Sequence, residues 1–248
     1  MSSHYKIVLG LETQVPYHSR QIFQAFLGFV SDYSPDEIIG VGDHLDCPSP
    51  SRWNRGTAAE YAGNLQREID VMKGMFADIR TVFDGVFSLH EGNHESRINT
   101  YARTKAPAFA DLDCLEVPSL LDYSGFAIRA RKPVEQLYKR TSVVTTHGDL
   151  IKRVSPTAGA TALAHARRFG RSVVCGHTHR MGLLQESDAS RTLVGVETGH
   201  MMDIKKAEYV LAPNWQAGWV VAEVNENTGR THFSLVPVSP TGVVTFHG

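Results

Sequence analysis

The sequence predicts an α/β fold of four layers, in which two β-sheets pack face to face as a sandwich and helices flank them. Up to Cys175, short apolar strands alternate with helical patterns. Beyond it, short strands follow one another, separated by turn signals such as Asn227-Thr228-Gly229. This change of pattern fits two packed sheets with helices outside. No internal repeat or linker divides the chain, so residues 1–248 are expected to form one domain.

The composition is that of an ordinary globular protein. A chain of 248 residues can bury a large core without disulfides. The net charge of −1 and the lack of Lys/Arg clusters argue against tight binding to long nucleic acid, although a nuclease that holds a few phosphates at metals remains compatible. Cys47, Cys114 and Cys175 form no CxxC pair and are expected to be free thiols in a reducing compartment.

The chain shows no pattern typical of export or membrane insertion. Its first residues lack a charged-then-apolar signal, and no apolar run approaches the roughly 18 residues of a membrane span. A soluble cytoplasmic protein without a membrane partner is therefore expected.

In the first half, apolar spacing defines the expected elements. Strands are expected at 6–11, 37–41 and 86–90, helices at 18–30, 57–83 and 96–103, and a Pro/Ser loop at 47–56. The first helix is expected because Ile22, Phe26 and Val30 share one face. The longest helix is expected because apolar residues recur every three or four positions from Leu65 to Phe83.

In the second half, the expected elements are shorter. Strands are expected at 142–146, 172–175, 181–185, 192–197, 219–224 and 231–236, and a helix at 157–169. Residues 105–139 contain three prolines and no clear period. This segment is expected to be an excursion that caps the polar loops at the strand ends.

Four polar blocks follow expected strands. They are GDHLD at 42–46, GNHE at 92–95, TTHGD at 145–149 and GHTH at 176–179. Loops at strand ends are where rigid scaffolds place functional side chains. Imidazole nitrogens and carboxylate or amide oxygens suit Mn, Fe, Zn, Ni or Co. One block alone would indicate little, but four in order predict a metal site.

The residue types suit a pair of metal ions. Asp43 is the candidate for a carboxylate that touches both ions. His177 and His179, two residues apart in a tight loop, can address neighbouring ions. Asn93 offers an amide oxygen and His147 an imidazole. Two cations can hold an anionic substrate and generate hydroxide at neutral pH, which is the logic of phosphoester cleavage.

The four motifs together resemble the calcineurin-like metallophosphoesterase superfamily. The resemblance covers residues 5–200, and the opening LETQVPYH at 11–18 is similar to a variant of small phage and bacterial members. It implies a β-sandwich flanked by helices with the metals at the carboxyl ends of the strands. It also implies that Asp43 bridges both ions. The second ion would be held by Asn93, His147 and His177, and the first by His179.

The same resemblance assigns a catalytic role to His94. This residue would not bind metal, but would face the scissile phosphate and protonate or stabilise the leaving oxygen. Asp46 would orient His94 by a hydrogen bond. Arg97 is a candidate for gripping a phosphate oxygen, with a surface salt bridge as the alternative. His200, which follows Thr198 and Gly199 at a strand end, is a candidate substrate contact.

The first block departs from the family pattern. Where the family usually has Asp-x-His, this chain has Glu12-Thr13-Gln14. Glutamate keeps the carboxylate on a longer arm, and glutamine replaces an imidazole with a weak amide oxygen. Glu12 and Gln14 are therefore expected to bind the first ion weakly or to select a harder ion such as Mn or Mg. Of the two divalent ions, the second is expected to be the better occupied.

The favoured activity is hydrolysis of a phosphate ester, more specifically a phosphodiester, by a metal-bridging hydroxide with His94 assisting the leaving group. Manganese is the favoured metal, with Fe, Ni, Co, Zn and Mg as alternatives. The substrate is a phosphate ester that could be nucleotide-like. A nuclease or nucleic-acid end-processing phosphatase is the second hypothesis. A metal-binding pseudoenzyme with a weakened first site is the third.

Overall fold

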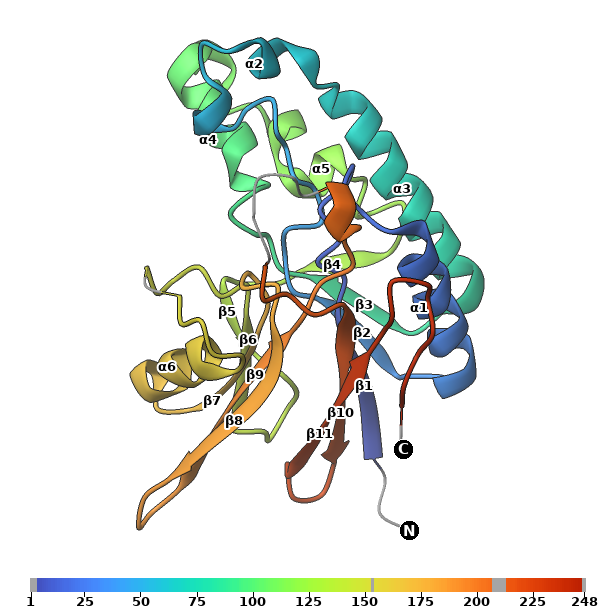
Figure 1. Ribbon diagram of the computed structural model, residues 1–248, viewed down its shortest axis with the longest axis vertical. Coiled ribbons are helices and arrows are strands. Elements are labelled where there is room, and N and C mark those ends of the chain that lie inside the picture. Colours follow the sequence, from blue (N-terminus) through green and yellow to red (C-terminus); the bar gives the residue numbers. More distant parts are fainter. Residues whose placement is uncertain (1–3, 153, 207–212, 247–248) are drawn as a thin grey trace.

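The computed structural model describes residues 4–152, 154–206 and 213–246, and it confirms the two-sheet sandwich flanked by helices (Figure 1). The first sheet has the order β11-β10-β1-β2-β3-β4. Its strands are β1 (His4–Gly10), β2 (Glu37–Gly40), β3 (Val86–Leu89), β4 (Ile128–Ala130), β10 (Gly218–Asn225) and β11 (Thr231–Pro237). Neighbours from β1 to β4 are parallel, whereas β10 is antiparallel to both β1 and β11.

The second sheet has the order β5-β6-β7-β9-β8. Its strands are β5 (Val134–Gln136), β6 (Val143–Thr146), β7 (Ser172–Cys175), β8 (Met181–Ser187) and β9 (Thr192–Thr198). The three central strands β6, β7 and β9 are parallel, and an antiparallel strand closes each edge. In both sheets the parallel strands therefore deliver their carboxyl ends to one side of the sandwich.

The apolar side chains alternate between two packing faces. Ile7 and Leu9 of β1 belong to the cluster between the sheets, and so does Val174 of β7. Val8 belongs instead to the cluster beneath the helices of the first sheet, and Val173 packs beneath the helix on the second. Because successive strand residues point to opposite faces, a run of consecutive apolar residues such as Ile7 to Leu9 buries a strand on both sides.

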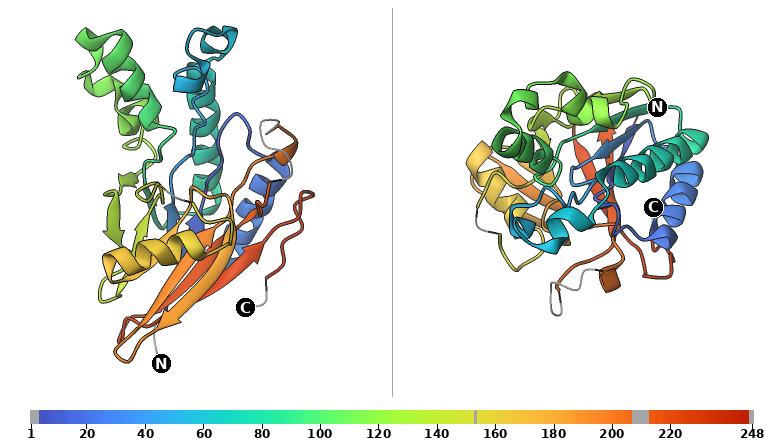
Figure 2. Two further views of the ribbon diagram at one scale, coloured as in Figure 1. Left: turned by 60° about the vertical axis from the view of Figure 1, so that its left-hand side comes forward. Right: turned by 90° about the horizontal axis from the view of Figure 1, so that it is seen from above.

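Helices cover the outer face of each sheet. The α-helices are α1 (Arg20–Tyr33), α2 (Ala58–Ala62), α3 (Leu65–Val82), α4 (Ser96–Lys105), α5 (Val117–Leu120) and α6 (Ala160–Phe169). Short 3₁₀ turns occupy Arg52–Asn54, Pro107–Phe109, Asp113–Leu115 and Ile204–Lys206. Helices α1 and α3 pack on the first sheet and α6 on the second, while α2, α4 and the start of α3 rise beyond the sheets as two arms (Figure 2). No described helix is long and apolar enough to cross a membrane.

Two sequence expectations need correction. The pattern at 57–83 is not one helix, because the chain breaks at Gly63 and restarts at Asn64, whose side chain accepts a hydrogen bond from the Arg67 N–H. An asparagine cap of this kind marks a new helix start. Residues 105–139 are not wholly an excursion from the sheets. Their second half supplies β4 and β5, each at the edge of a sheet.

Candidate metal centre

The loops after five parallel strands meet above the sandwich. Those after β1, β2 and β3 come from the first sheet, and those after β6 and β7 from the second. They carry Glu12, Gln14, Asp43, Asn93, His94, His147, His177 and His179. Asp43, Gln14, His177 and His179 have left-handed backbone angles, with φ between 47° and 68°. Non-glycine residues rarely adopt this conformation, and such strain collects at functional sites.

His147 lies at the centre of the better-formed half of this site. Its Nδ1 lies 2.9 Å from the Val41 carbonyl oxygen, and because a carbonyl only accepts, Nδ1 carries the proton. The opposite nitrogen, Nε2, lies 3.0 Å from Asn93 Oδ1. It also lies 3.2 Å from His177 Nδ1 and 3.3 Å from Asp43 Oδ2. Such a group of electron-pair donors around one nitrogen calls for a positive charge among them, either a second proton on His147 or a metal ion.

The pKa shifts of Asp43 and His147 follow from this pairing. Burial alone would raise the pKa of Asp43, but His147 and His94 lower it, so the carboxylate is charged. Burial would likewise lower the pKa of His147, but the Asp43 carboxylate raises it to about 10. A divalent ion would replace the extra proton, because metal ligands bind in their deprotonated form.

Glu12, Gln14 and His179 form the other half of the site. Glu12 Oε2 accepts a hydrogen bond from the His177 N–H at 2.9 Å, and Oε1 lies 3.1 Å from His179 Nε2, out of hydrogen-bond alignment. Gln14 Nε2 lies 2.6 Å from the same His179 nitrogen. Glu12 Oε1, Gln14 Oε1 and His179 Nδ1 are buried without a hydrogen-bond partner. Buried polar atoms are seldom left unpaired, so these orphans fit a cation-binding role.

The donor sets therefore fit a metal in both halves, but unequally. Among the described residues, Asp43, His147 and His177 are the one group of three His, Cys, Asp or Glu donors whose ligand atoms lie within 4.8 Å of one another. Within the same part of the chain that the structure describes, Glu12 and His179 form no such group with a third residue of these types. The donor atoms thus lie closer together around His147, in the half of the site that the sequence predicts to be the more occupied.

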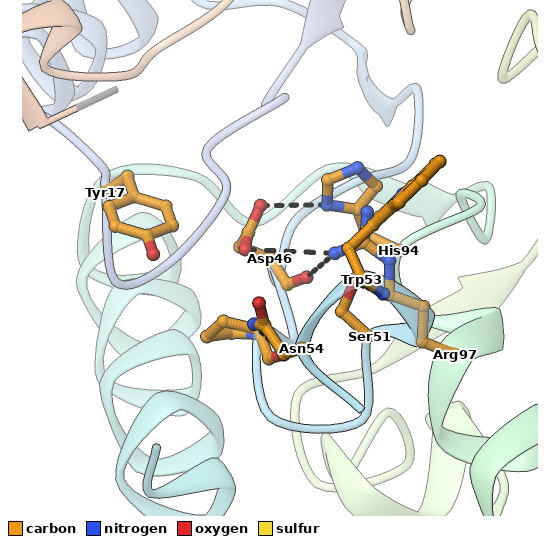
Figure 3. Close-up of a pocket in the computed structure, with 8 residues that line it drawn as sticks. Tyr17, Asp46, Ser51, Trp53, Asn54, His94 and Arg97 are labelled. Carbon is orange, nitrogen blue, oxygen red and sulfur yellow. Dashed lines mark hydrogen bonds and ion pairs between the residues drawn. The ribbon is translucent and has the colours of Figure 1, made fainter. Parts of the chain in front are cut away.

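His94 lies beside the metal donors and faces a cavity (Figure 3). Its Nδ1 lies 2.9 Å from Asp46 Oδ1 as an ion pair outside hydrogen-bond alignment, and its Nε2 lies 3.7 Å from Asp43 Oδ2. Arg97 Nη1 donates to the Asp46 carbonyl oxygen at 2.7 Å and lies 3.9 Å from Asp46 Oδ2. Burial opposes protonation of His94, but Asp43 and Asp46 raise its pKa above the ordinary value. The structure thus brings together the predicted orienting pair, and Arg97 braces Asp46.

His200 lies behind His179 rather than in the cavity. It is fully buried, and its Nδ1 accepts a hydrogen bond from the Met202 N–H at 2.9 Å. Its ring centroid lies 5.8 Å from that of His179, and burial together with His179 lowers its pKa to about 3. His200 is therefore a neutral ring packed against a candidate ligand. Its role as a substrate contact stays a prediction that this burial does not favour.

Glu95 is a functional candidate that the sequence interpretation missed. Its fully buried carboxylate accepts hydrogen bonds from the N–H groups of Asp43 at 3.1 Å, Gly92 at 2.9 Å and Leu45 at 2.8 Å. It thereby ties the loop of Asp43 to the GNHE loop. The signal was its place as the last residue of GNHE. A Cβ on Gly92 would lie 2.1 Å from Asp43 Oδ1, so this approach requires glycine.

Comparisons with known proteins supply relatives and similar folds. The Gene 54 protein of Mycobacterium phage D29 is 35% identical over 243 residues, which is 94% of this chain and 93% of that protein. The Gene 54 protein of Mycobacterium phage L5 is 34% identical over the same shares. No family model matches the chain.

Similar solved structures have low sequence identity. Vacuolar Protein Sorting 29 from Cryptosporidium parvum has a TM-score of 0.46 at 13% identity, covering 95% of this chain and 98% of that one. The E. coli phosphoesterase Yfce has a TM-score of 0.41 at 12% identity, covering 92% and 98%. These values transfer no residue role to this chain.

Proposed function

The chain belongs to the family of the mycobacteriophage Gene 54 proteins, and we propose that it is a metal-dependent phosphoesterase. One observation carries the proposal. Asp43, Asn93 and His177 converge on His147 Nε2 at 3.0–3.3 Å, with His94 directly beside them. The order and type of these residues are what the resemblance to the calcineurin-like metallophosphoesterases rests on.

Each residue would have a distinct task in this reaction. A divalent ion bound by Asp43, Asn93, His147 and His177 would supply a Lewis acid and an activated water at neutral pH. His94, held through Nδ1 by Asp46, would present Nε2 to the leaving oxygen of the ester. Asp43 and Asp46 both raise the pKa of His94, and the contact with Asp46 is the one that an ion on Asp43 would leave in place. We favour a phosphodiester as the substrate.

We further propose unequal loading of two ions, with manganese as the favoured metal. Asp43 would bridge the two. Glu12 and Gln14 offer an oxygen-rich, less convergent donor set for the first ion, whereas His147 organises the second. Anomalous scattering from crystals grown at stepped Mn concentrations measures each occupancy separately. Equal, full occupancy in protein as purified would refute this proposal.

An ester-hydrolysis assay tests the activity. Wild-type protein with added Mn should cleave bis-p-nitrophenyl phosphate faster than p-nitrophenyl phosphate. His94→Ala should lower the rate by roughly 10²- to 10⁴-fold, the usual contribution of a general acid. His4→Ala is the matched control, because His4 is an exposed histidine at the start of β1. No hydrolysis of either ester by metal-loaded protein would instead favour a pseudoenzyme.

A further inference from the structure

Two neighbouring cavities open beside His94. The first, of about 430 Å³, is lined by Tyr17, Asp46, Trp53, Asn54, His94 and Arg97 among others (Figure 3). The second, of about 310 Å³, is lined by Arg52, Trp53, Arg55, Asn93, Ser96 and Arg97 among others. Ser51, Trp53 and Arg97 line both. A ligand longer than a single phosphate ester could therefore lie in both cavities while one end touches the reaction site.

Trp53 offers an open aromatic face between these cavities. It is 75% exposed, although a tryptophan is ordinarily among the more buried residues. The Arg52 guanidinium lies 4.7 Å from its ring centroid. Tyr17 stands on the opposite side of the first cavity (Figure 3). An exposed indole beside a catalytic histidine suits a planar ring, because bases stack on aromatic side chains.

The loop that carries Trp53 is braced. The Trp53 N–H donates to Ser51 Oγ at 3.4 Å, and Asn54 Nδ2 donates to the Pro48 carbonyl oxygen at 2.7 Å. Arg55 Nη2 lies 3.4 Å from Thr104 Oγ1, which connects the loop to α4. The indole is thus presented from a positioned turn.

The second cavity is positively charged. Three arginines line it and none of its lining residues is acidic. Arg97 is engaged with Asp46, whereas Arg52 lies over the Trp53 ring and Arg55 donates to Thr104, and both of these partners are uncharged. Guanidinium groups without a carboxylate partner suit a phosphate oxygen.

We propose, resting on the phosphoesterase function above, that this site takes a single-stranded nucleic acid, with one base stacked on Trp53 and the neighbouring phosphate held by Arg52 and Arg55. Along a single nucleic-acid strand, each base is followed by a phosphate. The two cavities offer partners in the same order, an aromatic ring for a base and then arginines for a phosphate. The net charge of −1 limits the contact to few phosphates. A mononucleotide has no second phosphate for the arginine cavity.

A binding assay without added metal tests the base contact. The ligand is a fluorescein-labelled short oligothymidylate, followed by anisotropy. Trp53→Ala should weaken binding roughly 5- to 150-fold, the range for losing one stacked base, whereas Trp53→Phe should keep most of the affinity. Phe109→Ala is the matched control, since Phe109 is 60% exposed in the other arm. If Trp53→Ala binds as tightly as Phe109→Ala, the proposal is overturned.

Salt dependence tests the phosphate contacts. Each single-strand phosphate contact contributes a slope of about −0.7 in log affinity against log salt, so Arg55→Ala should flatten the slope by roughly 0.7. Arg168→Ala, which removes an exposed arginine from α6, should leave it unchanged. Competition by a cyclic mononucleotide at equal affinity would overturn the strand assignment.

The two proposals fail in different ways. Cleavage of bis-p-nitrophenyl phosphate with no binding of the oligothymidylate would overturn the nucleic-acid assignment and leave the phosphoesterase standing. Trp53-dependent binding without cleavage of any ester would support the nucleic-acid site and overturn the phosphoesterase.

Discussion

Replacing Glu95 by glutamine separates the positioning of Asp43 from its chemistry. The Glu95 carboxylate accepts three backbone N–H groups, two at Oε2 and one at Oε1. Glutamine keeps the volume and can accept the pair from Asp43 and Gly92, but its NH₂ group then faces the Leu45 N–H. The change weakens charge-assisted hydrogen bonds and leaves a buried donor unpaired, so we expect a loss of roughly 2–4 kcal/mol in unfolding free energy.

The same substitution should loosen the metal. Because Glu95 fixes the backbone of Asp43, Mn affinity should fall roughly 10- to 100-fold, the usual effect of removing a group that orients a ligand. Urea unfolding measures the first effect and calorimetric Mn titration the second. Glu116→Gln is the control, since Glu116 is an exposed carboxylate just before α5 that contacts neither Asp43 nor its loop. If both variants match wild type within about 0.5 kcal/mol, the reasoning about Glu95 is wrong.

Three further predictions concern neighbouring sites. Burial raises the pKa of Glu68 to about 7, so between pH 4.5 and 7 the folded state holds more protons than the unfolded one and stability falls as pH rises. Glu68→Gln should remove this loss of at most ~3 kcal/mol, measured by urea unfolding at pH 5 and pH 8. An unchanged dependence of stability on pH would contradict this prediction. Gln14→His should tighten binding of the weaker ion, and a calorimetric Mn titration identical to wild type would count against this. Gly176→Ala puts a Cβ 2.6 Å from Glu12 Oε2, so urea unfolding should show a loss of roughly 1–3 kcal/mol, and wild-type stability would show that the carboxylate can move aside.

Regular elements with one dominant signal were predictable from the sequence. Short strands with a buried apolar centre, such as β2 and β7, had expected boundaries within a residue or two of the observed ones. The helix expected at 57–83 began too early, because its apolar spacing runs only from Leu65 to Phe83, and Gly63 with the Asn64 cap separates α2 from α3. The three-residue strands β4 and β5 have no period long enough to detect. Their pairing depends on partners that are distant in sequence.

The site was predictable where loops follow parallel strands. Asp43, Asn93, His147 and His177 meet because their strands end on the same side of the sandwich. Residue types alone could not give the role of Glu95, which depends on the approach of two loops to within hydrogen-bond distance. The exposure of Trp53 likewise depends on how its loop folds back, and composition carries no sign of it.

The pairing of β1 with β10 has a consequence for how the protein is made. Tyr5 lies opposite Val224, so the strand that leads to Glu12 has an unpaired edge until the chain has been synthesised past β10. The Glu12 carbonyl oxygen accepts a hydrogen bond from the Met201 N–H at 2.9 Å, which cannot form until Met201 has been synthesised. Contacts this distant in sequence form late in folding. In a ribosome-bound chain, metal binding should therefore follow the pairing of β1 with β10. Chains stalled before β10 should expose the unpaired edge of β1 to chaperones and proteases.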